Sequence, residues 1–186
     1  MPFGSLWLQV ILATVAVFVL SSIAHMVIGH HKRDYKALPN EDAVAEALRK
    51  ASPVPGVYMI PSCPDMSKMK DPATVKKYTD GPVGLVTLMR NKPPNLGRHL
   101  VQWFVFCFLV SFTAAYVARK SLVPGEPALT VMRVTGTVAF AGYAYGYFQD
   151  SIWKGIPWSN SLRGVADSVA YAIVTGLIFR LMWPAA

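Results

Sequence analysis

The sequence predicts an all-α membrane protein: a four-transmembrane-helix bundle with a small α+β extramembrane module inserted between helices 1 and 2. Three observations support this class. The stretch 5–29 contains no Lys, Arg, Asp or Glu and exceeds the about 20 apolar residues that cross a bilayer core. Hydrophobic residues make up 53% of the chain, and its mean hydropathy of +0.36 lies above ordinary globular values. Most of the positive charge lies in one segment, 30–98.

The expected organisation follows the apolar segments in order. It comprises transmembrane helix 1 at 5–29, the module and its linker at 30–98, helix 2 at 99–118, helix 3 at 129–149, an interfacial hairpin at 150–162 and helix 4 at 163–183. The residues before the first apolar run include no Lys or Arg, and that run is long, so we expect an uncleaved anchor and not a cleaved signal peptide.

The segment 30–98 has the patterns of a small α+β module. Asn40 is placed to cap a helix over Glu41–Ala51, with acidic residues in its first turn and basic residues in its last. The β-branched and aromatic residues of 56–60 and 83–89 predict two strands. Asp71 and Pro72 open a second short helix between the strands.

The placement of Lys and Arg predicts the orientation. Under the four-span arrangement, 14 of the 18 Lys and Arg lie on one side of the membrane and 4 on the other. Basic residues concentrate on the cytoplasmic side. We therefore expect the loop 30–98 in the cytoplasm and both termini in the periplasm. The net charge of +8 lacks the contiguous basic helix or aromatic signature of a nucleic-acid-binding protein, so no nucleic acid is expected.

Small residues at helical spacing predict close helix packing in helices 3 and 4. In lipid, such residues let backbones approach closely, and this approach drives association. The packing of the bundle itself is the simpler interpretation, and an oligomer interface is the alternative. The predicted packing residues are Gly142, Gly146, Gly164, Ser168, Ala172 and Gly176.

Two groups of residues are candidate metal or cofactor ligands. His25 and His99 fall near the same end of the bundle and would bind haem b or a metal ion through imidazole, although histidines are also ordinary at headgroup level. Soft sulfur ligands suited to Cu(I) recur in the module at Met59, Cys63, Met66 and Met69, where methionine is equally common as packing material. The sequence requires no cofactor.

A polar pocket is possible at the cytoplasmic end of the bundle, formed by Gln102, Asp150 and Asp167. The simpler interpretation of Asp167 is a local ion pair with Arg163, one helical turn earlier. No Ser-His-Asp order, phosphate-binding loop, HExxH or GxGxxG motif occurs, so the chain is expected to be non-catalytic.

Four features resemble an uncharacterised family of small bacterial multi-span inner-membrane proteins. They are HHKRDYKALPNED at 30–42, MKDPATVKKYTDGPVG at 69–84, QDSIWKGIPWS at 149–159 and the aspartate at position 167. The resemblance covers nearly the whole chain. It implies the bacterial inner membrane and carries no known activity or functional residue.

These observations lead to a primary expectation and two alternatives. The primary one is a non-catalytic accessory or structural subunit that packs against partner membrane proteins, with membrane lipids, other transmembrane subunits or a second copy as its partners. The first alternative is a membrane protein that binds haem or a metal ion through His25, His30, His31 and His99, or copper through the cluster from Met59 to Met69. The second is a small transporter or lipid-handling protein that uses the polar pocket.

Overall fold

The computed structural model describes residues 3–186, and the chain divides into two compact units. The first unit comprises the residues up to Tyr35 together with Asn95–Ser151 and Ile156–Ala186. The second comprises Lys36–Pro94 and Ile152–Gly155. Each unit is described by itself.

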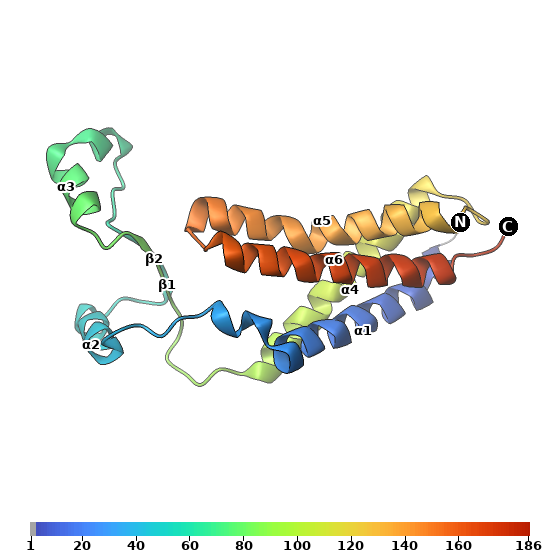
Figure 1. Ribbon diagram of the computed structural model, residues 1–186, viewed down its shortest axis with the longest axis horizontal. Coiled ribbons are helices and arrows are strands. Elements are labelled where there is room, and N and C mark those ends of the chain that lie inside the picture. Colours follow the sequence, from blue (N-terminus) through green and yellow to red (C-terminus); the bar gives the residue numbers. More distant parts are fainter. Residues whose placement is uncertain (1–2) are drawn as a thin grey trace. The chain divides into compact units, whose positions relative to one another are not determined.

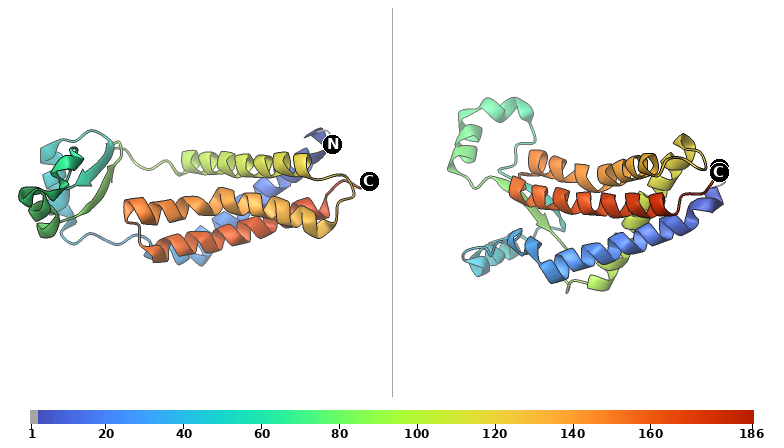
Figure 2. Two further views of the ribbon diagram at one scale, coloured as in Figure 1. Left: turned by 90° about the horizontal axis from the view of Figure 1, so that it is seen from above. Right: turned by 45° about the vertical axis from the view of Figure 1, so that its right-hand side comes forward.

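The first unit is built from four long helices (Figure 1). They are α1 at Trp7–Ser22, α4 at Leu96–Ser121, α5 at Ala128–Lys154 and α6 at Trp158–Leu181. A π-helical turn at Ile23–Ile28 extends α1, and a short 3-10 helix follows at His30–Arg33. Helices α5 and α6 lie side by side in both Figure 1 and Figure 2.

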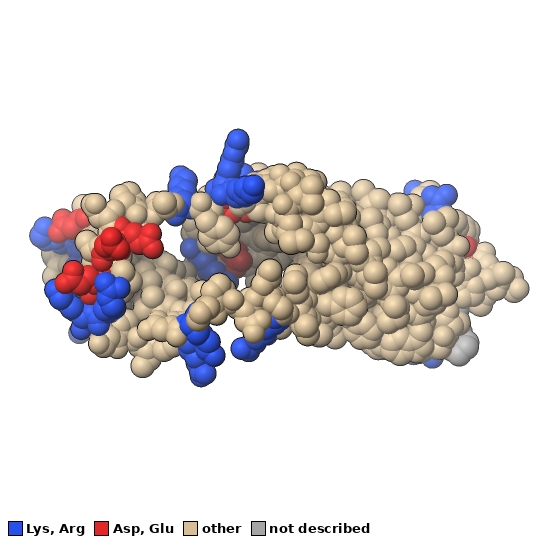
Figure 3. Space-filling view, turned by 90° about the horizontal axis from the view of Figure 1, so that it is seen from below, with Lys and Arg blue, Asp and Glu red and all other residues tan. Residues whose placement is uncertain are grey.

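Three helical segments are long and apolar enough to cross a membrane: Gly4–Ile28, Leu96–Ser121 and Trp158–Leu181. They have the character expected of a multi-pass membrane protein. On the face drawn in Figure 3, the middle of the first unit carries no Lys, Arg, Asp or Glu. Helix α5 is as long, but Arg133, three glycines and three tyrosines make it less apolar. The structure thus supports three of the four predicted spans.

The helix ends differ from the predicted boundaries around 150–162. The sequence predicted an interfacial hairpin there, whereas α5 continues through Lys154 and α6 begins at Trp158. Only Gly155–Pro157 connect the two helices. Gly155 has a φ of +69°, a left-handed conformation that glycine adopts without steric cost. Helices α5 and α6 are tied near this end by a 2.6 Å hydrogen bond between the hydroxyls of Ser151 and Ser161.

Two clusters of buried side chains form the core of the first unit, and all four long helices contribute to both. One cluster includes Val10, Ala115, Val131 and Phe179. The other, nearer the π-helical turn, consists of Val17, Cys107, Val110, Ala139, Tyr143, Tyr171 and Ala172. Alanine and valine make up more than half of these clusters and allow close packing, while Phe179, Tyr143 and Tyr171 are the large side chains that fill the remaining space.

Most of the predicted packing residues lie at helix contacts. A Cβ on Gly142 would lie 3.1 Å from Val110, and a Cβ on Gly176 would lie 3.0 Å from Met132. Gly164 is the closest contact, because a Cβ there would lie 2.4 Å from the ring of Tyr147. Ser168 and Ala172 are buried. By contrast, a Cβ on Gly146 meets no atom of the described residues within 4 Å.

The second unit contains the elements expected of the module. Helix α2 spans Glu41–Ala51, helix α3 spans Pro72–Asp80, and the strands β1 and β2 span Gly56–Ile60 and Gly84–Leu88. The strands pair antiparallel, with Tyr58 opposite Val86. None of these elements has a fully buried residue. This agrees with a segment too small to hold a sizeable core of its own.

Candidate metal centre

The first span does not end as a regular α-helix. After the π-helical turn, Gly29 adopts a φ of +63° and His30–Arg33 form the 3-10 helix. π-helical turns occur frequently at functional sites, and a left-handed φ favours glycine. The chain turns back at Gly29, so the ring of His31 stacks on the ring of His25 with their centroids 4.4 Å apart.

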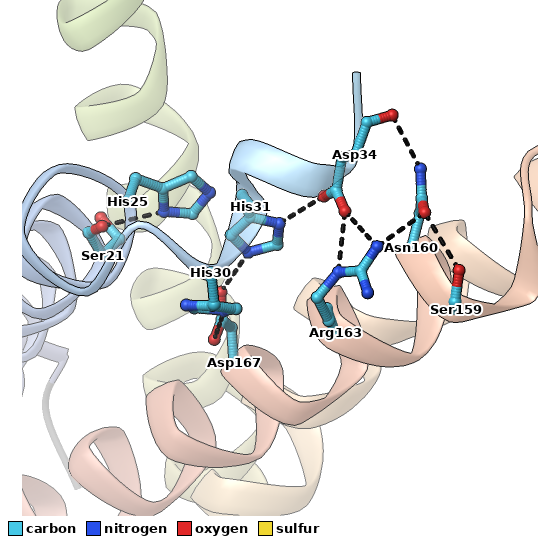
Figure 4. Close-up of polar contacts among 9 residues, drawn as sticks. All are labelled: Ser21, His25, His30, His31, Asp34, Ser159, Asn160, Arg163 and Asp167. Atoms are coloured by element: carbon cyan, nitrogen blue, oxygen red, sulfur yellow. Dashed lines mark hydrogen bonds and ion pairs between the residues drawn. The ribbon is translucent and has the colours of Figure 1, made fainter. Parts of the chain in front are cut away.

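Asp167 on α6 contacts two successive histidines (Figure 4). His30 Nε2 lies 3.0 Å from Asp167 Oδ1, and His31 Nε2 lies 2.8 Å from Asp167 Oδ2. The side chains of His31 and Asp167 are only 15% and 13% exposed, so water screens this pair weakly. The sequence predicted a local pair between Asp167 and Arg163. That prediction is wrong, because Asp167 binds the histidines and Arg163 binds another carboxylate.

That carboxylate is Asp34, which holds the other ring nitrogen of His31. Asp34 Oδ2 lies 2.5 Å from His31 Nδ1. Arg163 donates to Asp34 Oδ1 from Nε at 2.8 Å and from Nη2 at 2.5 Å. Asn160 donates from Nδ2 to the backbone carbonyl of Asp34 at 3.0 Å and accepts from Arg163 Nη2 at 2.7 Å. Asp34 is therefore fixed through both its side chain and its backbone (Figure 4).

The two carboxylates favour the imidazolium form of His31. Partial burial works against the charged ring, but the hydrogen bonds and charges of Asp167 and Asp34 outweigh it, so the pKa of His31 is raised. Burial likewise works against ionisation of Asp34, and the hydrogen bonds from His31 and Arg163 outweigh it, so the pKa of Asp34 is lowered. With His31 protonated, Asp34 and Asp167 are balanced by His31 and Arg163.

His25 is oriented as a ligand by the backbone of α1. Its Nδ1 lies 2.9 Å from the backbone carbonyl of Ser21. A carbonyl only accepts hydrogen bonds, so Nδ1 is the protonated nitrogen, and in the neutral ring Nε2 carries the free lone pair. A hydrogen bond of this kind from the second ring nitrogen is the usual way in which proteins orient a metal-binding histidine.

A cavity of about 310 Å³ adjoins the cluster. Its polar lining residues include His25, His31, Asp34, Asp150 and Asn160. Of the three residues predicted to form a polar pocket, Asp150 lines this cavity, whereas Asp167 is not among its lining residues and Gln102 is exposed on α4.

One ligand atom from each of His25, His31 and Asp167 lies within 4.8 Å of the other two. Two imidazoles and a carboxylate form a ligand set found in proteins for zinc and for iron(II). In a tetrahedral zinc site with bonds of about 2.0–2.1 Å, ligand atoms are about 3.3 Å apart. His31 Nε2 and Asp167 Oδ2, at 2.8 Å, are slightly closer than that. A metal ion would therefore have to replace the proton shared by His31 Nε2 and Asp167 Oδ2, and the rings of His25 and His31, which are stacked at an interplanar angle of 10°, would have to turn toward it.

The other predicted ligands are placed differently. His99 on α4 is exposed and lines a second cavity together with His25, outside the carboxylate cluster. In the second unit, Met59 and Met66 are exposed, whereas Cys63 and Met69 are half-buried. The Cys63 thiol donates to the backbone carbonyl of Asp65 at 3.2 Å. The haem and copper sites stay predictions.

Sequence reasoning named His31 among four histidines of an alternative haem or metal site, and it missed Asp34 and Arg163 as site residues. His31 and Asp34 are three positions apart and form the local half of the cluster, so the HHxxD pattern was a usable signal. Asp167 lies 136 positions after His31, and that contact depends on how α6 packs. No protein-family model, curated protein or solved structure matches this chain.

Proposed function

We propose that this chain is an integral membrane protein that binds a divalent transition-metal ion at one end of its helix bundle, through His25, His31 and Asp167. The proposal rests on a series of polar contacts. Arg163 binds Asp34, Asp34 binds Nδ1 of His31, and the other ring nitrogen of His31, Nε2, lies beside Asp167 Oδ2. His31 Nε2 and Asp167 Oδ2 are the two potential ligand atoms. Carboxylates that bind the outer nitrogen of a histidine set its tautomer and raise its basicity as a ligand.

The composition of the cluster favours Zn²⁺ or Fe²⁺ over softer or harder ions. Imidazole nitrogen suits zinc, iron, copper and nickel, and a carboxylate alongside it disfavours Cu(I), which prefers sulfur. His30, with Nε2 already 3.0 Å from Asp167 Oδ1, is the nearest source of a fourth ligand. Otherwise water from the adjoining cavity would fill the remaining position.

The membrane arrangement that we propose has four spans. Helix α5 has 27 residues and is therefore about 40 Å long, enough to cross a hydrocarbon core of about 30 Å. It shares both buried clusters with the other helices. Arg133 lies near its start and can extend toward the headgroups. The distribution of basic residues then supports a cytoplasmic location for the metal centre, and the family resemblance supports the bacterial inner membrane.

Metal binding is tested on the full chain purified in mild detergent. The protein is treated with a chelator and dialysed against Zn²⁺, and bound zinc is then measured by inductively coupled plasma mass spectrometry. We expect one zinc ion per chain, and less than half of that for Asp167→Asn, which keeps the shape of the side chain but removes its charge.

The matched control is His99→Gln, which changes a histidine at the same end of the bundle outside the cluster and should keep one zinc ion per chain. The proposal fails if the unaltered chain binds no stoichiometric zinc or iron. It also fails if Asp167→Asn and His99→Gln bind as much zinc as the unaltered chain. In either case the cluster would serve only to tie the end of the first span to α6.

A further inference from the structure

A second cavity of about 300 Å³ lies within the first unit, between the end of the first span and the start of α4. Tyr147 of α5 and Tyr171 of α6 also line it. Its volume is at the lower end of the range for small-molecule sites, so it has room for a single ring system but not for a whole lipid. His25 is shared with the candidate metal centre, whereas the other lining residues are separate from the cluster.

The lining is largely apolar and aromatic, with two serines and two histidines among its residues. The ten described residues that form it include no Lys, Arg, Asp or Glu. A phospholipid headgroup or an anionic metabolite would therefore find no Lys or Arg partner here. The wall residues lie in the three apolar segments that are long enough to cross a membrane, or in α5 beside them. Met26 and Leu96, which are 67% and 64% exposed, lie on its open side. These features indicate an uncharged ligand that enters from the bilayer.

One buried polar group in the wall of this cavity has no partner. Tyr171 is 3% exposed, its hydroxyl oxygen is covered by protein atoms, and that hydroxyl makes no hydrogen bond with any described residue. Leaving such a group unsatisfied costs about 1–3 kcal/mol, so an acceptor on a ligand would be favoured here. The ring centroids of Trp103 and Tyr171 are 6.4 Å apart. The indole nitrogen of Trp103 already donates a hydrogen bond to the hydroxyl of Ser21, at 2.7 Å. Trp103 therefore contributes a fixed aromatic wall and no free donor.

We propose that this cavity binds the head group of a lipid-soluble quinone. A quinone is a flat, uncharged ring with carbonyl oxygens that only accept hydrogen bonds, and it usually bears an apolar tail. After a rotation of the Tyr171 ring that opens its covered hydroxyl to the cavity, this hydroxyl would donate to one carbonyl, and the Trp103 ring would contact the face of the quinone. The imidazoles of His25 and His99 provide further polar contacts on the exposed side. The tail would leave past Met26 and Leu96 into the lipid.

The proposal is tested with decylubiquinone on the full chain in lipid nanodiscs. Quinones quench indole fluorescence, so binding is followed as saturable quenching. The chain has five tryptophans, and the Trp103→Phe variant identifies the part of the signal that arises at the cavity. We expect Tyr171→Phe, which removes only the hydroxyl, to raise the Kd by about five- to tenfold, as expected for the loss of one hydrogen bond of about 1 kcal/mol.

Tyr143→Phe is the matched control. Tyr143 is a buried tyrosine 5.4 Å from Tyr171 between ring centroids, and it does not line the cavity. The Kd of Tyr143→Phe for decylubiquinone should equal that of the unaltered chain. Decylbenzene, which has a ring and a tail but no carbonyls, should compete at least tenfold less well than decylubiquinone. The proposal is overturned if quenching does not saturate, if both tyrosine variants bind equally, or if decylbenzene competes equally well.

The test is separate from that of the metal centre. Asp167→Asn removes a proposed metal ligand and does not line this cavity, so it should leave the Kd for decylubiquinone unchanged in the presence of a chelator. If the unaltered chain binds decylubiquinone but no stoichiometric zinc or iron, only the metal proposal is overturned. If the unaltered chain binds zinc but not decylubiquinone, only the quinone proposal is overturned.

Discussion

His31 Nε2 lies 2.8 Å from Asp167 Oδ2, although the two residues are 136 positions apart in the chain. The contact joins the segment that follows the first span to Asp167, the tenth residue of α6. Both side chains are more than four-fifths buried, and each has a further polar partner. The pair is thus placed both to hold the bundle end together and to present two ligand atoms to a metal ion.

Removing the charge of Asp167 should destabilise the metal-free protein. Asp167→Asn leaves the imidazolium of His31 with one carboxylate partner in place of two, and hydrogen bonds to charged groups contribute about 1.5–3 kcal/mol each. We expect a lower midpoint of thermal unfolding in detergent with a chelator present. Asp42→Asn, at an exposed position of α2, should leave the midpoint unchanged. Equal midpoints for both variants would show that the His31–Asp167 pair contributes no stability.

The stability of the metal-free protein should depend on pH through His31 and Asp34. The pKa of His31 is raised above 6.5, so its contribution is complete below pH 6.5 and is lost as the pH rises through the folded value. The pKa of Asp34 is lowered below 3.8, so its contribution is complete above pH 3.8 and is lost as the pH falls through the folded value. Stability from the cluster is therefore greatest between these limits. Thermal unfolding in a chelator as a function of pH measures this, and His31→Gln should remove the decline above pH 6.5.

Gly164 should tolerate no side chain, because its Cβ would lie 2.4 Å from the ring of Tyr147. Overpacking of this kind costs about 1–3 kcal/mol. We expect Gly164→Ala to lower the thermal midpoint and, by displacing Tyr147, to alter both cavities that this residue lines.

Gly146→Ala is the control on the neighbouring helix, because a Cβ there has open space. Alanine is favoured over glycine in a helix by up to about 1 kcal/mol, so this variant should be as stable as the unaltered chain or more stable. A Gly164→Ala variant that is as stable as Gly146→Ala would contradict the close contact between α5 and α6.

The left-handed turn at Gly29 should be needed for metal binding. With φ at +63°, alanine is strained there, and a Cβ would also lie 2.9 Å from the Lys32 side chain. Gly29→Ala should weaken zinc binding by about tenfold, because about 1–2 kcal/mol of strain opposes the conformation that brings His31 onto His25.

Gly155→Ala introduces comparable strain at φ +69° in the connection between α5 and α6. It should leave zinc affinity within twofold. Gly29→Asn, which adopts the left-handed conformation more readily than alanine, should recover most of the affinity. Equal zinc affinities for Gly29→Ala and the unaltered chain would show that the left-handed turn is not needed for metal binding.

The orientation of the membrane arrangement is tested with the two cysteines. Cys63 is half-buried in the second unit, and Cys107 is fully buried in the bundle. A membrane-impermeant thiol reagent should label Cys63 in inside-out vesicles and not in intact cells, and Cys107 should stay unlabelled in both. Labelling of Cys63 in intact cells would reverse the proposed orientation.

Several elements were predictable because local patterns determine them. The uncharged run 5–29 forms α1 and the π-helical turn, and the segment Glu41–Ala51 forms α2 with the predicted bounds. The strand at Gly56–Ile60 was also predicted with its bounds. The predicted cap is wrong, because Asn40 adopts a left-handed φ of +54° and its side chain makes no capping hydrogen bond. Hydrophobic length and β-branched content act within a few residues, so a sequence displays them directly.

The candidate site was less predictable because its contacts are long-range. Arg163 has Asp167 one helical turn away, which made a local pair the simplest expectation. The structure instead brings Asp34 to Arg163 across 129 positions. Which partner is chosen depends on the direction in which the chain leaves Gly29, and no local pattern specifies that. Four expectations stay predictions: the accessory role, the haem and copper sites, the transporter alternative and the bacterial membrane. A pull-down in mild detergent tests the accessory role.

The most direct test of the metal centre is X-ray absorption at the zinc edge, measured on the zinc-loaded, purified chain. We predict a first shell of nitrogen and oxygen atoms at about 2.0–2.1 Å with the multiple-scattering signature of two or three imidazoles. That signature should weaken in His25→Gln and stay unchanged in His99→Gln. A shell that contains sulfur at about 2.3 Å, or imidazole scattering that is the same in both variants, would contradict the assignment.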